Sequence, residues 1–194
     1  MKTSMKSMLA AAGLALAVTG TALAGGMSGG MSDNNSVMVG GAAMYQSKNI
    51  VQNALNSKDH TTLVMLVKEA GLVSALEGKG PFTVFAPTNQ AFAELPASTV
   101  KALQEPKNSA ELKSILLYHV VPGRYDFNKL ADMIKQGGGT AMLKTLNGAD
   151  LTFMMNGDHN IVVKDAKGNV AQISTYDVYQ SNGVIQVINH VLMP

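Results

Sequence analysis

Tyr118 and His119 are the residues in this sequence whose types and spacing most directly suggest chemistry, because a phenol stands beside an imidazole. They lie in the segment LLYHVVPG, residues 116–123, between aliphatic residues and before a Pro-Gly turn signal. Such a pair can exchange protons with a substrate, contact a partner, or join a helix end to a strand. The third interpretation is favoured, because a histidine beside a helix end can donate to a free carbonyl there. A tyrosine can likewise bury its ring while its hydroxyl stays paired. We keep Tyr118 and His119 as candidates for partner contact.

Other residues that could support catalysis or metal binding are widely scattered. The histidines are at positions 60, 119, 159 and 190, and none has a second histidine two or four positions away, the spacing of local metal ligands. The chain has no cysteine, no Gly-x-Ser-x-Gly nucleophile motif and no phosphate-binding glycine loop. We therefore predict no catalytic, cofactor-binding or metal-binding residues. An exported hydrolase with a site assembled from distant residues is the least favoured alternative.

The first 24 residues resemble an export signal. Lys2 and Lys6 precede an apolar run over residues 8–18, and Ala22-Leu23-Ala24 offers small residues at a cleavage site. The apolar run is about half of what a membrane-spanning helix needs. We predict a secretory signal peptide over residues 1–24, an exported protein that is periplasmic or extracellular, and no membrane span after the signal is removed.

Residues 25–44 have a different composition, rich in glycine, serine and methionine and without an apolar period. This composition predicts a flexible leader. Its methionine thioethers could bind copper(I), although no histidine or cysteine supports that hypothesis.

The net charge of the processed chain is close to zero, because loss of Lys2 and Lys6 leaves thirteen basic residues against thirteen acidic ones. Without a cluster of basic side chains, binding to nucleic acid is not expected.

The pattern from Tyr45 onward predicts one domain over residues 45–194. Apolar residues recur at helical spacing near 50–55, 60–77, 91–95, 98–105, 111–118 and 126–134. Gly71 is expected to divide the second of these segments. Residues 82–86 predict one short buried strand, closed by Pro87.

After residue 139 the apolar period changes from that of helices to that of strands. Strands are expected near 141–146, 150–155, 160–165, 169–174 and 184–192, with Asn147-Gly148 and Asn156-Gly157 as hairpin turns. The last segment is apolar at nearly every position, which predicts a central strand covered on both faces. Helices followed by strands favour an α+β fold in a single domain.

Three stretches together resemble the signatures of the fasciclin domain family. They are GPFTVFAPTNQAF at residues 80–92, the Tyr-His motif within LLYHVVPG, and SNGVIQVINHVLMP at residues 181–194. The likeness extends over about residues 45–194, and the layout is similar to short secreted single-domain bacterial members. The family usually has histidine where this chain has Gln186 and an acidic residue where it has Asn189, and His190 stands one position further on.

The resemblance implies a wedge-shaped β-sandwich of two packed sheets with several helices. It also implies a cell-adhesion or extracellular-matrix interaction module, which binds a cell-surface, matrix or envelope protein or polymer without catalysis and without a cofactor. The alternative is a periplasmic small-ligand carrier with a crevice between helices and sheet. Most signature residues have a structural explanation as strand, turn and helix cap; they are Thr83, Phe85, Pro87, Thr88, Asn89, Phe92, Asn182, Gly183, Val184 and Ile185.

Overall fold

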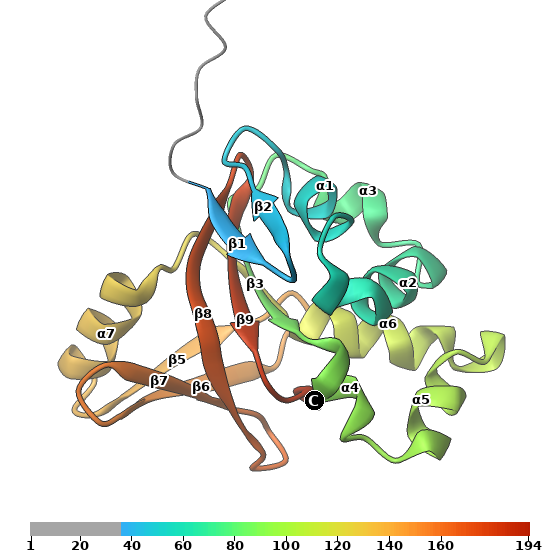
Figure 1. Cartoon of the computed structure of the whole chain (residues 1–194). Coiled ribbons are helices and arrows are strands. Elements are labelled where there is room, and N and C mark those ends of the chain that lie inside the picture. The colour runs from blue at the N-terminus through green and yellow to red at the C-terminus, as the bar shows by residue number, and fades with distance from the viewer. Residues whose placement is uncertain (1–35) are drawn as a thin grey trace, which may run out of the picture. The chain divides into compact units, whose positions relative to one another are not determined.

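The computed structural model describes residues 36–194, shown in colour in Figure 1. The predicted signal peptide and residues 25–35 of the predicted leader lie outside the described residues. The last part of that leader is not a flexible segment, because β1 (Val37–Val39) and β2 (Ala42–Met44) form an antiparallel hairpin. Val39 and Met44 are buried in the core. The apolar residues that hold this hairpin are too few to give a period in the sequence.

The first half of the described chain is helical. Its helices are α1 (Ile50–Ala54), α2 (Thr61–Glu69), α3 (Val73–Leu76), α4 (Asn89–Ala93), α5 (Ala97–Leu103) and α6 (Ser109–Tyr118), with 3-10 turns η1 (Lys58–His60) and η2 (Pro106–Asn108). Gly71 separates α2 from α3 with a φ of 67°, which confirms the predicted division. Asn108 stands three residues before Glu111, a spacing that predicts a capping box at the start of α6, but its amide instead donates to the carbonyl of Ala102 at 2.7 Å.

Seven strands form one mixed sheet in the order β4-β3-β9-β8-β7-β6-β5. Their bounds are β3 (Phe82–Pro87), β4 (Val120–Pro122), β5 (Thr140–Lys144), β6 (Asp150–Asn156), β7 (Asn160–Lys164), β8 (Val170–Gln180) and β9 (Gly183–Ile188). Helix α7 (Phe127–Gln136) connects β4 to β5. The predicted hairpins are present: Asn147-Gly148 lies in the turn between β5 and β6, and Asn156 ends β6 with Gly157 opening the turn to β7.

Strand β9 lies at the centre of the sheet, as its apolar sequence predicts. It pairs in parallel with β3 and antiparallel with β8, and all six of its residues are buried. Strand β8 is longer than the predicted segment and runs on to Gln180. In the second half of β8, buried and exposed side chains alternate less clearly, because the pairing of β8 with β9 shifts register twice between Ile173 and Val178.

The sheet folds over on itself along β8, so that it forms two packed layers. Phe85 of β3 and Phe153 of β6 lie on opposite layers, yet their ring centroids are only 5.2 Å apart. Both side chains are fully buried. The backbone N–H of Leu146, just after β5, also donates to the carbonyl of Val120 on β4. These contacts give the predicted α+β architecture with packed sheets and several helices.

The helices divide between two hydrophobic clusters. Helices α1 to α6 gather on one side of the sheet, and α7 lies on the other side (Figure 1). One cluster joins the hairpin and the first six helices to strands β3, β8 and β9. The other lies between the folded layers of the sheet and under α7, with Leu130 and Ile134 fully buried. Within residues 36–194, no helix is long and apolar enough to cross a membrane.

Gln186 holds the irregular part of β8 to β9. The residue facing it, Asp177, has a φ of 57°, in the left-handed region that non-glycine residues rarely adopt. The backbone N–H of Asp177 donates to the Gln186 side-chain oxygen at 3.0 Å. The Gln186 amide donates to the Asp177 carboxylate at 2.9 Å and to the carbonyl of Tyr125 at 3.1 Å. A neutral amide therefore satisfies these groups at a position where the family usually has histidine.

Replacing Gln186 with methionine tests this role. The Gln186→Met variant keeps the volume but leaves the Asp177 N–H and the Tyr125 carbonyl without their partner. We expect the free energy of unfolding to fall by about 3 kcal/mol, the scale of leaving buried polar groups unpaired. Urea unfolding measures it. Gln172→Met, on an exposed position of β8, serves as the control, and an equal effect of both substitutions would contradict the assignment.

Candidate functional site

Tyr118 is fully buried at the end of α6 and joins that helix to the strand-rich half. Its hydroxyl donates to the carbonyl of Asp150 at 2.9 Å and accepts from the backbone N–H of Ala166 at 2.9 Å. Burial raises the pKa of the Tyr118 phenol, and the hydrogen bond from Ala166 opposes that shift. The phenol is thus a neutral structural group that holds the start of β6 and the turn after β7.

His119 is also buried and uses both ring nitrogens within the fold. Its Nδ1 lies 2.9 Å from the carbonyl of Ile115, so Nδ1 carries the proton and donates. Nε2 then accepts from the backbone N–H of Leu192 at 3.0 Å. Burial lowers the pKa of His119 to about 4, against smaller opposing effects of the Ile115 carbonyl and Asp165. The neutral imidazole connects the end of α6 to the C-terminal segment.

The structure therefore places both predicted contact candidates inside the domain. Tyr118 has no exposed surface, and 3% of His119 is exposed. Every polar atom of the two side chains has a partner in the fold. In this conformation the two side chains offer almost no surface to a partner.

The residues of the first signature connect β3 to its neighbours. Thr83 donates to the carbonyl of Gly123 at 2.8 Å and accepts from the N–H of Tyr125 at 2.9 Å. Phe85 occupies the core between the sheet layers, and Pro87 is the buried last residue of β3. These side chains fix the edge of the sheet where β4 leads into α7.

The end of the same signature caps one helix and fixes a second. The hydroxyl of Thr88 accepts from the N–H of Ala91 at 3.3 Å, which caps α4 as predicted. Asn89 accepts from the N–H of Thr62 at 2.9 Å and donates to the carbonyl of Lys58 at 2.8 Å. Asn89 thus connects the start of α4 to the start of α2, while Phe92 is buried against the helical cluster.

In the closing signature, the Asn182 side chain connects the turn before β9 to the helices. The Asn182 oxygen accepts from the N–H of Ile50 at 3.0 Å, and its amide donates to the carbonyls of Leu76 and Gly78 at 2.8 and 2.9 Å. The next position, 183, requires glycine, because a Cβ there would stand 2.1 Å from the carbonyl oxygen of Phe82. Val184 and Ile185 then continue as buried residues of β9. This signature joins α1, α3 and the central strand.

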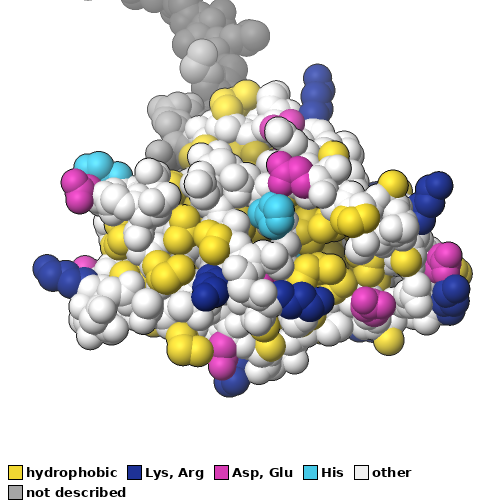
Figure 2. Space-filling model, turned by 90° about the horizontal axis from the view of Figure 1, so that it is seen from below, with side chains coloured by type: hydrophobic (Ala, Val, Ile, Leu, Met, Phe, Trp, Pro, Cys, Tyr) yellow, Lys and Arg dark blue, Asp and Glu magenta, His cyan; other side chains and the backbone are white. Residues whose placement is uncertain are grey.

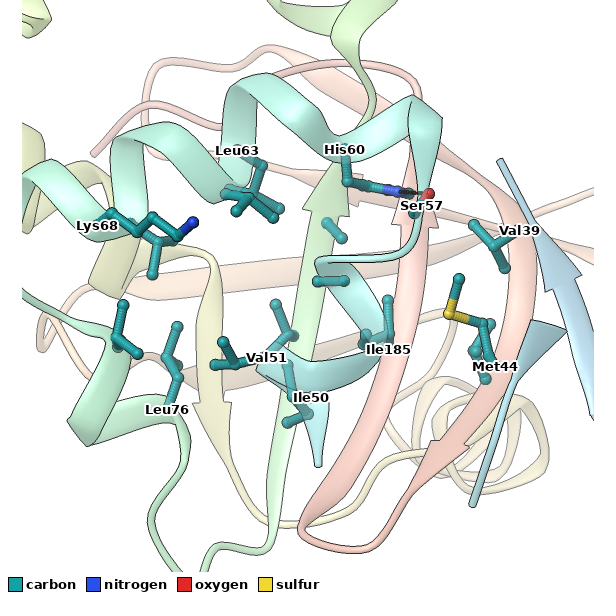
Figure 3. Close-up of a pocket in the computed structure, with 17 residues that line it drawn as sticks. Val39, Met44, Ile50, Val51, Ser57, His60, Leu63, Lys68, Leu76 and Ile185 are labelled. Atoms are coloured by element: carbon teal, nitrogen blue, oxygen red, sulfur yellow. Dashed lines mark hydrogen bonds between the residues drawn. The ribbon is translucent and has the colours of Figure 1, made fainter. Parts of the chain in front are cut away.

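An apolar pocket lies between the helices and the sheet, where the sequence suggested a crevice. Its accessible volume is about 50 Å³. The hairpin contributes Val39 and Met44, the helices contribute side chains such as Val51 and Leu63, and β9 contributes Ile185 (Figure 3). No acidic residue lines the pocket. Its surroundings favour hydrocarbon over water, because water in a cavity needs several polar partners.

His60 and Ser57 lie at the edge of this pocket, near the hairpin residues (Figure 3). His60 Nδ1 is 2.8 Å from the Ser57 hydroxyl, whereas Nε2 is buried without a hydrogen-bond partner. Burial lowers the pKa of His60, and the backbone of Ala86 and the carboxylate of Asp59 oppose this shift. The imidazole is therefore neutral at neutral pH and forms part of an uncharged wall.

A second, more open hollow lies on the surface between α2, α4 and α5. It has a volume of about 370 Å³ and includes Phe92, Leu95, Val100 and Lys101. Figure 2 looks onto this lower face and shows hydrophobic side chains around a hollow, with charged side chains set around them. We call this hollow the α4–α5 groove. It combines apolar surface with access from solvent.

The sequence did not single out most of the residues that line these two sites, and Asn89, Phe92 and Ile185 were named only as structural signature residues. His60 was recognised only as a widely spaced histidine, although its place at the start of an apolar helix is a signal of burial. The α4–α5 groove has no sequence signal, because its lining residues come from three separate helices. Among the residues that the structure describes, no group of three His, Asp or Glu side chains converges on a possible metal site.

Comparisons with known proteins agree with the geometry. The family model of the fasciclin domain matches residues 58–194. Protein sll1483 of Synechocystis sp. is 45% identical over 161 residues, which cover 82% of this chain and 81% of that protein. The cell surface glycolipoprotein MPB83 of Mycobacterium bovis is 37% identical over 126 residues, or 65% of this chain and 49% of that protein.

A solved structure is similar as well. It is the FAS1 domain pair from the insect cell adhesion molecule Fasciclin I, with a TM-score of 0.67 and 20% sequence identity. The match covers 76% of this chain but 51% of that chain, which contains two domains. This similarity concerns the fold.

The pH dependence of stability tests whether His119 is buried as a neutral imidazole. The native state resists protonation of this imidazole down to a pH of about 4, whereas an unfolded histidine binds a proton below about pH 6.5. Between these values the unfolded state binds more protons, so stability falls as the pH falls and the loss ends near pH 4. The full loss from this group is about 3 kcal/mol.

The measurement compares urea unfolding at pH 7 and pH 4.5 in the wild type and in His119→Gln. The variant lacks the titrating group, so its stability should depend less on pH over this window. His159→Gln, at an exposed turn position, is the matched control and should follow the wild type. A His119→Gln variant with the same pH dependence as the wild type would contradict burial of a neutral imidazole.

Proposed function

The chain belongs to the fasciclin domain family, and we propose that it is an exported cell-adhesion or matrix-interaction module that binds its partner without catalysis. Its site of action would be the periplasm or the extracellular space, as the export signal in residues 1–24 suggests. The partner would be a cell-surface, matrix or envelope protein or polymer. The names of two similar proteins, a cell surface glycolipoprotein and a cell adhesion molecule, support this direction.

The observation that carries the proposal is the contrast between buried signatures and an open surface groove. The signature residues are used by the fold, since they cap helices, fill the core or join strands. Partner binding would therefore depend mainly on other side chains on the surface. The α4–α5 groove offers half-buried apolar residues such as Leu95 and Val100 beside the cationic Lys101, a mixture typical of the centre and rim of a protein interface.

The test is a pull-down of native envelope and matrix fractions with three forms of the protein. Val100→Glu places a carboxylate among the apolar residues of the groove, and we expect capture of the partner to fall roughly tenfold because that charge would lose water on binding. Val170→Glu introduces the same change at an exposed position of β8, away from the groove, and should capture as the wild type does.

The possible outcomes distinguish whether the protein binds a partner from whether the α4–α5 groove is the place of contact. Equal capture by all three forms would place the contact outside the α4–α5 groove. If the wild type captures no more than an unrelated protein of similar size, the proposal of an adhesion module fails. Circular dichroism of each variant shows that the fold is kept.

A second candidate function, a small-ligand carrier, is favoured by the apolar pocket between helices and sheet. Binding pockets are mostly apolar and enclosed by secondary-structure elements, and this one is walled by the hairpin, α1, α2, α3 and the central strands. We expect native mass spectrometry of protein purified from its own host to detect a bound small molecule. A mass equal to that of the processed chain alone would argue against this candidate.

A further inference from the structure

The opening of the apolar pocket is marked by the exposure of its lining residues. Most of them are buried, and Ala54, Val64 and Val73 are half-buried. Lys68 is the one lining residue that is exposed. Figure 3 shows Lys68 at the end of the pocket away from His60 and Ser57. The pocket therefore opens where α2, α1 and α3 meet the surface, beside an ammonium group.

The interior of the pocket provides no hydrogen bond to a ligand. Ser57 and His60 pair with each other through the hydroxyl and Nδ1. The other ring nitrogen of His60 is buried by protein atoms, so it presents almost no surface to a ligand. All other lining residues except Lys68 are apolar. A polar or charged group inside the pocket would lose its hydration without compensation.

The size of the pocket limits what can enter it. A cavity needs about 10–15 Å³ of accessible volume to hold one water, so the pocket, with about 50 Å³, has room for roughly four groups of that size. This corresponds to a short length of alkyl chain. A longer chain would reach the opening, and its remaining part would lie next to Lys68.

The charge at the opening favours a negative head group. Lys68 forms no salt bridge with the residues that the structure describes. No acidic side chain lines the pocket to offset its charge. An anion held at this exposed position would keep most of its hydration and gain a modest attraction to the ammonium group.

We propose that the pocket binds a single-chain anionic amphiphile, a medium-chain carboxylate, with its alkyl end among Val51, Leu63 and Ile185 and its carboxylate beside Lys68. This inference rests on the carrier candidate and adds the class of ligand and the residue that recognises its head group. The energy of binding comes chiefly from the buried alkyl chain, because each methylene that leaves water favours the complex. Lys68 provides selectivity between head groups.

The test uses hexanoate and hexylammonium as probes, because they share the alkyl chain and differ in the sign of the head group. Binding is followed by NMR of methyl-labelled protein, with the methyl signals of Val51 and Leu63 reporting on the pocket. We expect hexanoate to bind about fivefold more tightly than hexylammonium at low salt, the scale of one exposed ion pair. Added salt should reduce the preference.

Two charge-reversal variants assign the preference to one residue. Lys68→Glu should reverse the order of the two probes while the methyl signals still respond to both. Lys113→Glu makes the same change in net charge at an exposed position of α6, which does not line the pocket, and should keep the order of the wild type. Both substitutions are on the surface, so the fold should tolerate them.

The other outcomes distinguish this inference from the carrier candidate. If both probes shift the methyl signals equally in all three proteins, the pocket accepts alkyl chains, and the assignment of a carboxylate to Lys68 is overturned. If neither probe shifts these signals, the pocket is closed to alkyl chains and the inference is overturned. The carrier candidate is then decided separately by the mass of the protein purified from its host.

Discussion

The structure depends on a bend in β8 that keeps the backbone of this strand hydrogen-bonded. A strand that passes from one layer of a folded sheet to the other must break its regular pairing, and each unpaired buried backbone group is costly. Here the pairing shifts register between Ile173 and Val178, and Asp177 adopts a left-handed conformation. Gln186 of the neighbouring strand replaces the missing ladder partner with its side chain. The bend then brings β6 over β3.

Two hydrophobic clusters follow from that bend, and buried polar side chains with several partners connect the elements around them. His119 connects the end of α6 to the C-terminal segment, and Asn182 connects α1 and α3 to the start of β9. These groups are buried and satisfied, so they determine one arrangement of the helices on the sheet. The signatures that identify the family are mainly such junctions. The surfaces that we propose for binding, the α4–α5 groove and the opening of the apolar pocket, are built mostly from other residues.

Much of the fold could be predicted because its signals are local. Asn-Gly turns, the Thr88 cap and the uninterrupted apolar run of β9 each depend on residues that are adjacent in sequence. The hairpin at residues 37–44 could not be predicted, since its stability comes from packing Val39 and Met44 against distant helices. Asn108 followed the pattern of a capping box, but its amide reached the carbonyl of Ala102 instead. The competing acceptor was visible only in three dimensions.

The sequence by itself determined most element types after residue 45, their order, the family and the absence of cysteine and nucleophile motifs, because all of these are read along the chain. Tertiary structure alone decided what the polar residues do. Tyr118 and His119 could have been contact residues or core until their four hydrogen bonds and their burial were known. The pocket and the place of Lys68 beside it are also tertiary features. The burial of these side chains and their proximity to one another depend on segments that are far apart in sequence. The pattern within one segment does not indicate which other segments will pack against it.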